Sequence, residues 1–179
     1  MVFAVATLCA VRAPLPDVFV SDRGDTVAVR GASGRLSAMR TTGSDGFALR
    51  EWLAADADAR APTDAGLRDG VSCDEIGCVA KLADGTIVAL PFAAQAFAED
   101  CRQATLVVSQ RTAPPGCAAV AIDRTVWPKS GASVLYRKGK EWETVAAYPA
   151  GYDRPWAKAA RRPRPAPSRS AFRWCWARW

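Results

Sequence analysis

The chain has 179 residues, a formal net charge of +6 and no histidine, and half of its residues are hydrophobic. This length suits one domain of ordinary size, and a charged fraction of 23% is that of a folded chain. The absence of histidine excludes Ser-His-Asp and Cys-His catalytic arrangements and histidine-based zinc or iron sites, and it removes the most common general base near neutral pH.

Residues 1–13 are predicted to be the end of a membrane helix. Residues Val2–Val11 carry no charge, but this segment is too short to span a bilayer, which takes about 20 residues. Arg12, followed by Pro14 and Pro16, is typical of a helix that leaves an apolar layer. Two other interpretations stay open: a signal peptide, although its charged start is missing, and a buried first strand or helix.

Three segments of the body, which we place at residues 14–156, have the alternation and turn residues of β-hairpins. Their strands are joined by Gly-Ala-Ser-Gly, Ala-Asp-Gly and Lys-Gly-Lys, which favour turns. The predicted pairs are residues 26–30 with 35–40, 78–82 with 86–90, and 133–137 with 142–148, and a further short strand is predicted at 17–20.

Two helices and two buried strands are predicted between the hairpins. The first helix covers residues 47–55, with Ser44 or Asp45 as its cap, and the second covers 92–103. Two uninterrupted apolar runs are typical of strands buried on both faces. They lie within the predicted strands at residues 105–109 and 118–122. This order of elements predicts an α/β fold with a mixed sheet, several β-hairpins and two to three helices.

A run of acidic residues follows the first predicted helix. Its members are Asp56, Asp58, Asp64 and Asp69. Their spacing does not match a calcium-binding loop, which needs ligands at alternating positions and a closing glutamate. Because alanine and proline are interleaved with them, we predict a solvated loop.

Four of the six cysteines lie in the body, namely Cys73, Cys78, Cys101 and Cys117. The preferred interpretation is two disulfides with the local pairing 73–78 and 101–117, although four cysteines allow three pairings. Free buried thiols and a four-cysteine zinc site stay open, but neither pair has the tight spacing usual for zinc. Disulfides would indicate an oxidising compartment.

The tail at residues 157–179 is predicted to be disordered, because arginine and proline alternate in it. Eight basic residues and no acidic residue follow Asp153. They are Arg154, Lys158, Arg161, Arg162, Arg164, Arg169, Arg173 and Arg178. Since the whole chain carries +6 and these residues account for +8, the first 153 residues carry −2. This balance argues against strong DNA binding by the body alone.

Three interpretations of the tail stay open. Its arginines would pair with phosphates while its tryptophans stack on nucleic-acid bases, or both would lie on an anionic membrane. The residues concerned are Arg161, Arg162, Arg164, Arg169, Trp174 and Trp176. The third interpretation is that the tail is unselected sequence from a shifted or extended reading frame.

Several blocks of the chain, in order, resemble the C-terminal region of alphaproteobacterial ComEC-type competence proteins. The blocks are PLPDVFVSDRGDTVAVRGASGRLSAMR, FALREWLAADADAR, CDEIGCVAKLADGTIVAL, EDCRQATLVVSQRTAPPGCAAVAIDR and GYDRPWAK. They lie between Pro14 and Lys158, so the resemblance covers most of the chain and leaves out the basic tail.

The resemblance implies a domain that follows the DNA-translocating channel of an inner-membrane protein. In many lineages this place is taken by a metallo-β-lactamase-like domain with a His/Asp metal cluster. Without histidine, no catalytic residue can be carried over, so we expect either a degenerate, metal-free form of that fold or another α/β module. The implied function is a non-catalytic accessory domain on the periplasmic face, which guides single-stranded DNA or braces the channel, with no cofactor and no small-molecule substrate.

Two alternatives belong to other classes of protein. One is a free-standing, disulfide-bonded periplasmic structural domain. The other is a residual metal-dependent hydrolase that uses carboxylates and cysteines as ligands. Its candidate ligands are Asp22, Asp25, Cys73, Cys78, Asp84 and Asp123.

Overall fold

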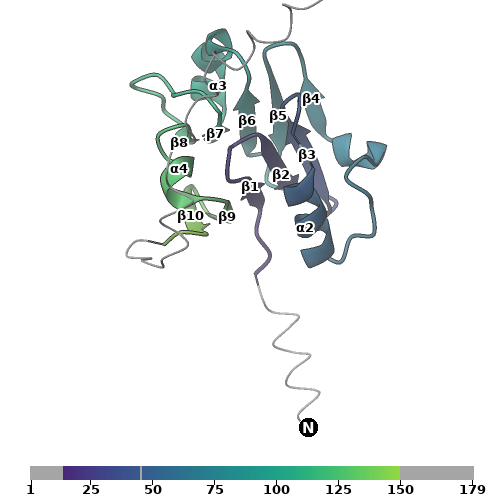
Figure 1. The fold of residues 1–179 in the computed structure, drawn as a ribbon. Helices are drawn as coiled ribbons and strands as arrows, with labels where there is room; N and C mark the ends of the chain where they lie inside the picture. Colours follow the sequence, from purple (N-terminus) through teal and green to yellow (C-terminus); the bar gives the residue numbers. More distant parts are fainter. Residues whose placement is uncertain (1–13, 45, 150–179) are drawn as a thin grey trace, which may run out of the picture. The chain divides into compact units, whose positions relative to one another are not determined.

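The structure, a computed structural model, describes residues 14–44 and 46–149 (Figure 1). The predicted membrane-helix segment at 1–13 and the predicted tail at 157–179 lie outside these residues. The described part of the chain has mixed α/β content, as the sequence predicts, with its strands arranged in two sheets.

The first sheet is antiparallel throughout and joins strands from both ends of the described chain. In spatial order its strands are β10 (Glu141–Ala146), β9 (Ser133–Lys138), β1 (Val18–Val20), β2 (Thr26–Arg30) and β3 (Leu36–Arg40). The central position of β1 depends on β9, because Val18 pairs with Leu135.

The second sheet is mixed. In spatial order its strands are β4 (Val71–Cys73), β5 (Gly77–Lys81), β6 (Ile87–Pro91), β7 (Leu106–Val108) and β8 (Val120–Ile122). The first three strands are antiparallel to one another, whereas β6, β7 and β8 run parallel. Parallel strands need a crossover connection. The short helices η2 (Ala94–Ala96) and α3 (Phe97–Gln103) make the first crossover, and the loop 109–119 makes the second.

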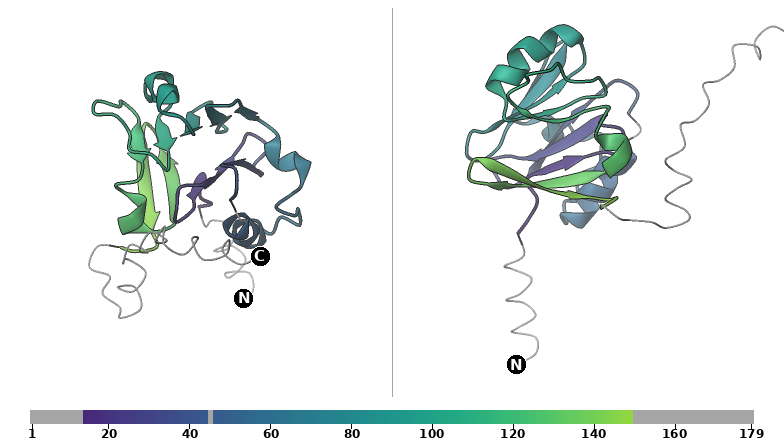
Figure 2. Two further views of the ribbon diagram at one scale, coloured as in Figure 1. Left: turned by 45° about the horizontal axis from the view of Figure 1, so that its top comes forward. Right: turned by 90° about the vertical axis from the view of Figure 1, so that its left-hand side faces the viewer.

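The two sheets share one apolar core between them, and each carries a helix on its outer face (Figure 2). Helix α2 (Phe47–Ala55) and the turn η1 (Ala65–Arg68) cover the first sheet, and α3 covers the second. The central cluster draws on strands of both sheets. Its buried members are Val18, Val20, Val27, Val29, Met39, Cys78, Ala80, Leu82, Val88, Leu90, Leu106, Val108, Ile122 and Leu135.

The central strands show how the sequence specifies this layering. In β2, Val27 and Val29 enter the core between the sheets, while Ala28 faces the layer of α2. In β6, Val88 and Leu90 enter the same core, while Ala89 faces the layer of α3. Successive side chains of a strand alternate between its faces, so these strands bury both faces and carry a small residue where a helix packs.

The disulfide Cys101–Cys117 joins α3 to loop 109–119, the crossover that contains no helix. Ala119 of loop 109–119 is buried in the outer cluster under α3, and Ala113 packs against that cluster. The second disulfide, Cys73–Cys78, joins residues that stand directly opposite each other on β4 and β5. Both follow the local pairing that the spacing favoured.

The prediction that Ser44 caps the first helix is wrong. The N-cap of α2 is Gly46, with φ of 74° and no side-chain cap, and the Ser44 hydroxyl instead accepts a hydrogen bond from Arg40 Nε at 2.8 Å. Asp45 lies outside the described residues. The predicted helix at 92–103 starts later, as η2 followed by α3, because residues 92–93 donate their amides to the carbonyl of Ile76.

The prediction of a solvated acidic loop is wrong for two of its four aspartates, since Asp64 and Asp69 are exposed but Asp56 and Asp58 are not. Asp56 forms an ion pair with Arg30 at 2.7 Å, and Asp58 pairs with Arg60 at 2.6 Å. All four of these side chains are largely buried. Asp64 caps η1 by accepting the Gly66 amide at 2.8 Å. The segment is a loop, but arginines draw two of its carboxylates inward.

Gly131, between α4 (Trp127–Ser130) and β9, has φ of 68° and ψ of −157°, a region open essentially to glycine alone. A Cβ atom there would lie 2.8 Å from the Tyr148 ring. We expect Gly131→Ala to lower the free energy of unfolding by about 2 kcal/mol in urea titrations, through strain and overpacking. The control Gly139→Ala, at φ of 61° in open space, should cost about 1 kcal/mol. Equal losses would contradict the role of Tyr148.

Candidate functional site

The carboxyl ends of β6, β7 and β8 meet at one edge of the second sheet, which we call the carboxyl edge. In α/β sheets, the crevice outside such strand ends is the usual place for a ligand. The loops after β7 and β8 are in contact, because the Arg124 amide donates to the Arg111 carbonyl at 3.4 Å. The turn between β1 and β2 joins them, since Gly24 lies against the Trp127 ring and the Ser109 carbonyl.

A buried serine holds this edge together. The Ser109 side chain has no exposed surface, and its hydroxyl donates to the Pro91 carbonyl at 3.1 Å at the end of β6. The same hydroxyl accepts the Arg111 amide at 3.1 Å, and the Ser109 carbonyl accepts a hydrogen bond from Trp127 Nε1 at 3.2 Å. Ser109 therefore fixes the loop after β7 against two neighbouring segments.

Asp123 fixes the loop after β8 in a similar way. Its carboxylate, on a residue 5% exposed, accepts hydrogen bonds from the Ala113 amide at 2.8 Å and from the amide and hydroxyl of Thr125 at 2.8 and 2.7 Å. Burial opposes ionisation, but these hydrogen bonds outweigh it and hold the pKa of Asp123 below its ordinary value. The Asp123 carboxylate therefore holds the loops after β7 and β8 together.

A cavity of about 360 Å³ opens at this edge. Its lining combines polar residues of the two loops with an apolar wall from the start of the η2–α3 segment and the second crossover. The lining residues are Ala94, Phe97, Gln110, Arg111, Thr112, Pro114 and Arg124. Both arginines are exposed, and no carboxylate pairs with either within the part of the chain that the structure describes. The chemistry this cavity offers is that of two guanidinium groups.

The candidate ligands of the hydrolase alternative are not brought together as a metal site. Cys73 and Cys78 are bonded to each other. Asp25 accepts a hydrogen bond from the Ser21 hydroxyl at 2.6 Å, and Asp84 lies in the β5–β6 turn, at the other end of the second sheet from the carboxyl edge. Among residues 14–44 and 46–149, no three acidic or cysteine side chains are grouped to hold a metal ion.

The predicted contact residues of the tail, Arg161, Arg162, Arg164, Arg169, Trp174 and Trp176, lie outside the described residues. Within the described ranges, no helix has the length and apolar character needed to cross a membrane.

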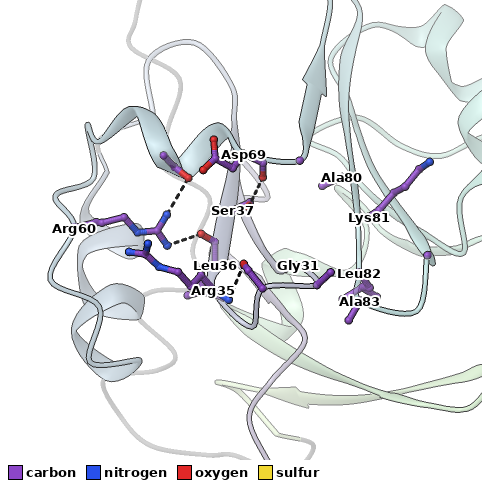
Figure 3. Close-up of a pocket in the computed structure, with 15 residues that line it drawn as sticks. Gly31, Arg35, Leu36, Ser37, Arg60, Asp69, Ala80, Lys81, Leu82 and Ala83 are labelled. Carbon is purple, nitrogen blue, oxygen red and sulfur yellow. Dashed lines mark hydrogen bonds between the residues drawn. The ribbon is translucent and has the colours of Figure 1, made fainter.

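A second cavity, of about 480 Å³, lies between the β2–β3 turn and the β5–β6 turn (Figure 3). Its walls are mostly small residues and backbone. The Arg60 guanidinium on one wall is fully engaged, donating to the carbonyls of Gly66 and Leu36 and to Asp58. Lys81 on the opposite wall points away from it (Figure 3). The polar groups do not converge on a common point, so this cavity makes a weaker site than the carboxyl edge.

A third cavity, of about 680 Å³, lies beside the Cys73–Cys78 disulfide. It is lined mainly by apolar residues, including Leu49, Val71 and Phe92. Arg40 on its rim is bonded to Ser44 Oγ and to the Ser44 carbonyl, so its guanidinium is not directed at a ligand.

Sequence reasoning missed the two arginines of the carboxyl edge. The prediction that the strand at 118–122 is buried on both faces is wrong, because β8 lies at the edge of its sheet and Val120 is 47% exposed. One signal for the arginines was present: each of the two strands is followed directly by polar residues that end in Arg-Thr, as Ser-Gln-Arg-Thr at 109–112 and Asp-Arg-Thr at 123–125. The repetition points to one edge only when β7 and β8 are known to be parallel neighbours.

Comparisons with protein-family models, with curated proteins and with solved structures found no match.

Proposed function

We propose that the chain is a non-catalytic accessory domain of a ComEC-type membrane protein for DNA uptake. The observation that carries the proposal is the order of sequence blocks that resemble the family between Pro14 and Lys158. The term non-catalytic rests on the sequence, because the His/Asp metal cluster of the family's lactamase-like domain has no counterpart in a chain without histidine. The role is to guide single-stranded DNA or to brace the channel.

Two features of the fold support this proposal. The described parts of the resembling blocks fold into one body, with helices on both outer faces of two sheets packed face to face. This layering is compatible with a degenerate metallo-β-lactamase-like domain. The two disulfides are of the kind that forms in oxidising compartments, which favours the periplasmic side of the inner membrane.

A second candidate is a free-standing periplasmic structural domain. It is favoured by the way the described body covers most of its own sheets: α2 and η1 cover the outer face of β1, β2 and β3, and α3 with loop 109–119 covers that of the second sheet. A domain that covers its sheets in this way does not need a channel to be stable.

The two candidates are separated by the gene and by its deletion. We expect the DNA immediately upstream of the codon for Met1 to encode a run of hydrophobic spans, and we expect deletion of codons 14–158 to lower transformation frequency by about tenfold or more. The control is an in-frame deletion of codons 159–179, which leaves the resembling blocks intact. If upstream DNA encodes no membrane segment and transformation is unchanged, the competence role is wrong and the structural domain takes its place.

A further inference from the structure

We propose that the cavity at the carboxyl edge binds a phosphate-type oxyanion between Arg111 and Arg124. This inference does not depend on the competence role, because it follows from the geometry of the two loops. It concerns a local site, and it is compatible with a net charge of −2 over the first 153 residues.

The first step is the position of the two guanidinium groups. Arg111 follows β7 and Arg124 follows β8, and these strands are parallel neighbours. The hydrogen bond between the Arg124 amide and the Arg111 carbonyl brings the two backbones together. Both side chains line the same cavity. Two long cationic side chains therefore reach one space from adjacent strand ends.

The second step is that Arg111 is already held in place. Its Nε atom donates to the Phe92 carbonyl at 2.8 Å, while its own amide is bonded to Ser109. This contact fixes the plane of the guanidinium and leaves both terminal nitrogens without an acceptor among the described residues. A prepositioned donor loses less side-chain entropy when a ligand binds.

The third step is that neither Arg111 nor Arg124 forms an ion pair with a carboxylate of the described residues. Four other arginines of the described chain form ion pairs: Arg30, Arg35, Arg60 and Arg137. Arg111 and Arg124 do not, although Asp123 directly precedes Arg124 in the sequence. The Asp123 carboxylate points into the loops, where three donors satisfy it. Its negative charge offsets part of the local positive field, which is a reason for two arginines at this site.

The fourth step selects the ligand class. One forked guanidinium satisfies the two oxygens of a carboxylate, whereas two guanidinium groups from different loops suit an anion with more oxygens and more charge. Gln110 and Thr112, on the same loop, add neutral donors for further oxygens. Phe97 and Pro114 form an apolar wall on one side of the cavity. These features fit a phosphate group, either free or as part of a phosphodiester.

The test is an NMR titration of the full ¹⁵N-labelled chain with inorganic phosphate at low ionic strength. We expect phosphate to shift the backbone amides of residues 110–112 and 124 and the Nε–H signals of both arginines. Acetate and chloride at matched ionic strength should shift them much less. Arg111→Gln with Arg124→Gln should weaken phosphate binding by about tenfold or more, the size expected when charge-assisted hydrogen bonds are lost.

Two variants keep this test independent of folding. Arg50→Gln with Arg68→Gln removes the same charge from exposed arginines outside the cavity, and should leave phosphate binding nearly unchanged. Arg124→Gln alone removes a side chain that makes no hydrogen bond in the described structure, so it should weaken binding without affecting the thermal midpoint. The proposal is overturned if phosphate causes no shift, if acetate or chloride shifts the same signals equally, or if the control variant loses as much binding.

A second titration, with a short oligothymidylate, distinguishes the two sources of the phosphate group. Shifts of the same signals at lower concentration than with inorganic phosphate would assign the site to a phosphodiester backbone. Binding of phosphate without binding of the oligonucleotide would assign it to free phosphate or a phosphomonoester.

Discussion

Replacing Arg60 by methionine is expected to lower the free energy of unfolding by about 3–5 kcal/mol, the usual cost of removing one partner of a buried ion pair. The Arg60 side chain is 10% exposed and that of Asp58 is 7% exposed. Arg60 donates to both Asp58 oxygens and to the carbonyls of Leu36 and Gly66 at 2.7 and 2.9 Å. It therefore joins the acidic loop to β3 and η1, and methionine would leave the Asp58 charge and two carbonyls without this donor.

Urea titrations at neutral pH test this expectation against Arg35→Met. Arg35 contacts the same carboxylate at 3.3 Å, but its side chain is 61% exposed, so its loss should cost less than about 1 kcal/mol. Equal losses in the two variants would show that burial does not set the strength of the Arg60 pair.

The same pair predicts a pH dependence. The hydrogen bond from Arg60 holds the pKa of Asp58 well below its ordinary value, against the opposing effect of burial. A depressed pKa in the folded state means that the stabilisation is complete above the ordinary value of about 4 and is lost as the pH falls below it. The original protein should therefore lose stability between about pH 4 and pH 2, and Arg60→Met should lose less over that range.

Removing the Cys101–Cys117 disulfide is expected to lower the free energy of unfolding by about 3 kcal/mol, and removing Cys73–Cys78 by about 2 kcal/mol. The difference follows from ring size, because the two bonds close sequence separations of 16 and 5 residues, and a longer closed loop restricts the unfolded chain more. Together they contribute about 5 kcal/mol, which is comparable to the whole stability of many domains.

Denaturation of the paired alanine variants, with and without dithiothreitol, measures each contribution. Cys101→Ala with Cys117→Ala should lose more than Cys73→Ala with Cys78→Ala. The control is the variant in which the four disulfide-bonded cysteines are all replaced by alanine, and reductant should not change its stability. A larger loss from the short ring than from the long ring would contradict the loop-entropy account.

Much of the fold could be predicted from local patterns. The helix at 47–55 and most strands were found because apolar side chains alternate or repeat at the right spacing next to clear turn residues. The strand Val71–Cys73 was missed because its side chains are half-buried or exposed and show neither an alternation nor an apolar run. The helices Ala65–Arg68 and Trp127–Ser130 are single turns, with the same consequence.

The acidic loop and the carboxyl edge depend on contacts between distant residues. Asp56 is buried because Arg30, far earlier in the chain, reaches it. Composition alone could not show this, because a solvated loop and a loop with buried ion pairs can have the same sequence pattern of aspartate, alanine and proline. Likewise, Arg111 and Arg124 become neighbours only through the parallel pairing of β7 with β8, which no local pattern specifies.

The position of β9 has a consequence for how the chain acquires its fold. The first sheet places β9 between β1 and β10, so the strand at Val18–Val20 is complete on both sides only after residue 138 has been made. The whole second sheet lies in the sequence between these two partners. Closing so long a loop costs chain entropy before its contacts form, and folds rich in such distant pairings form slowly. Until β9 docks, the edge of β1 has unpaired backbone groups, which a chaperone or the strand of another chain can reach.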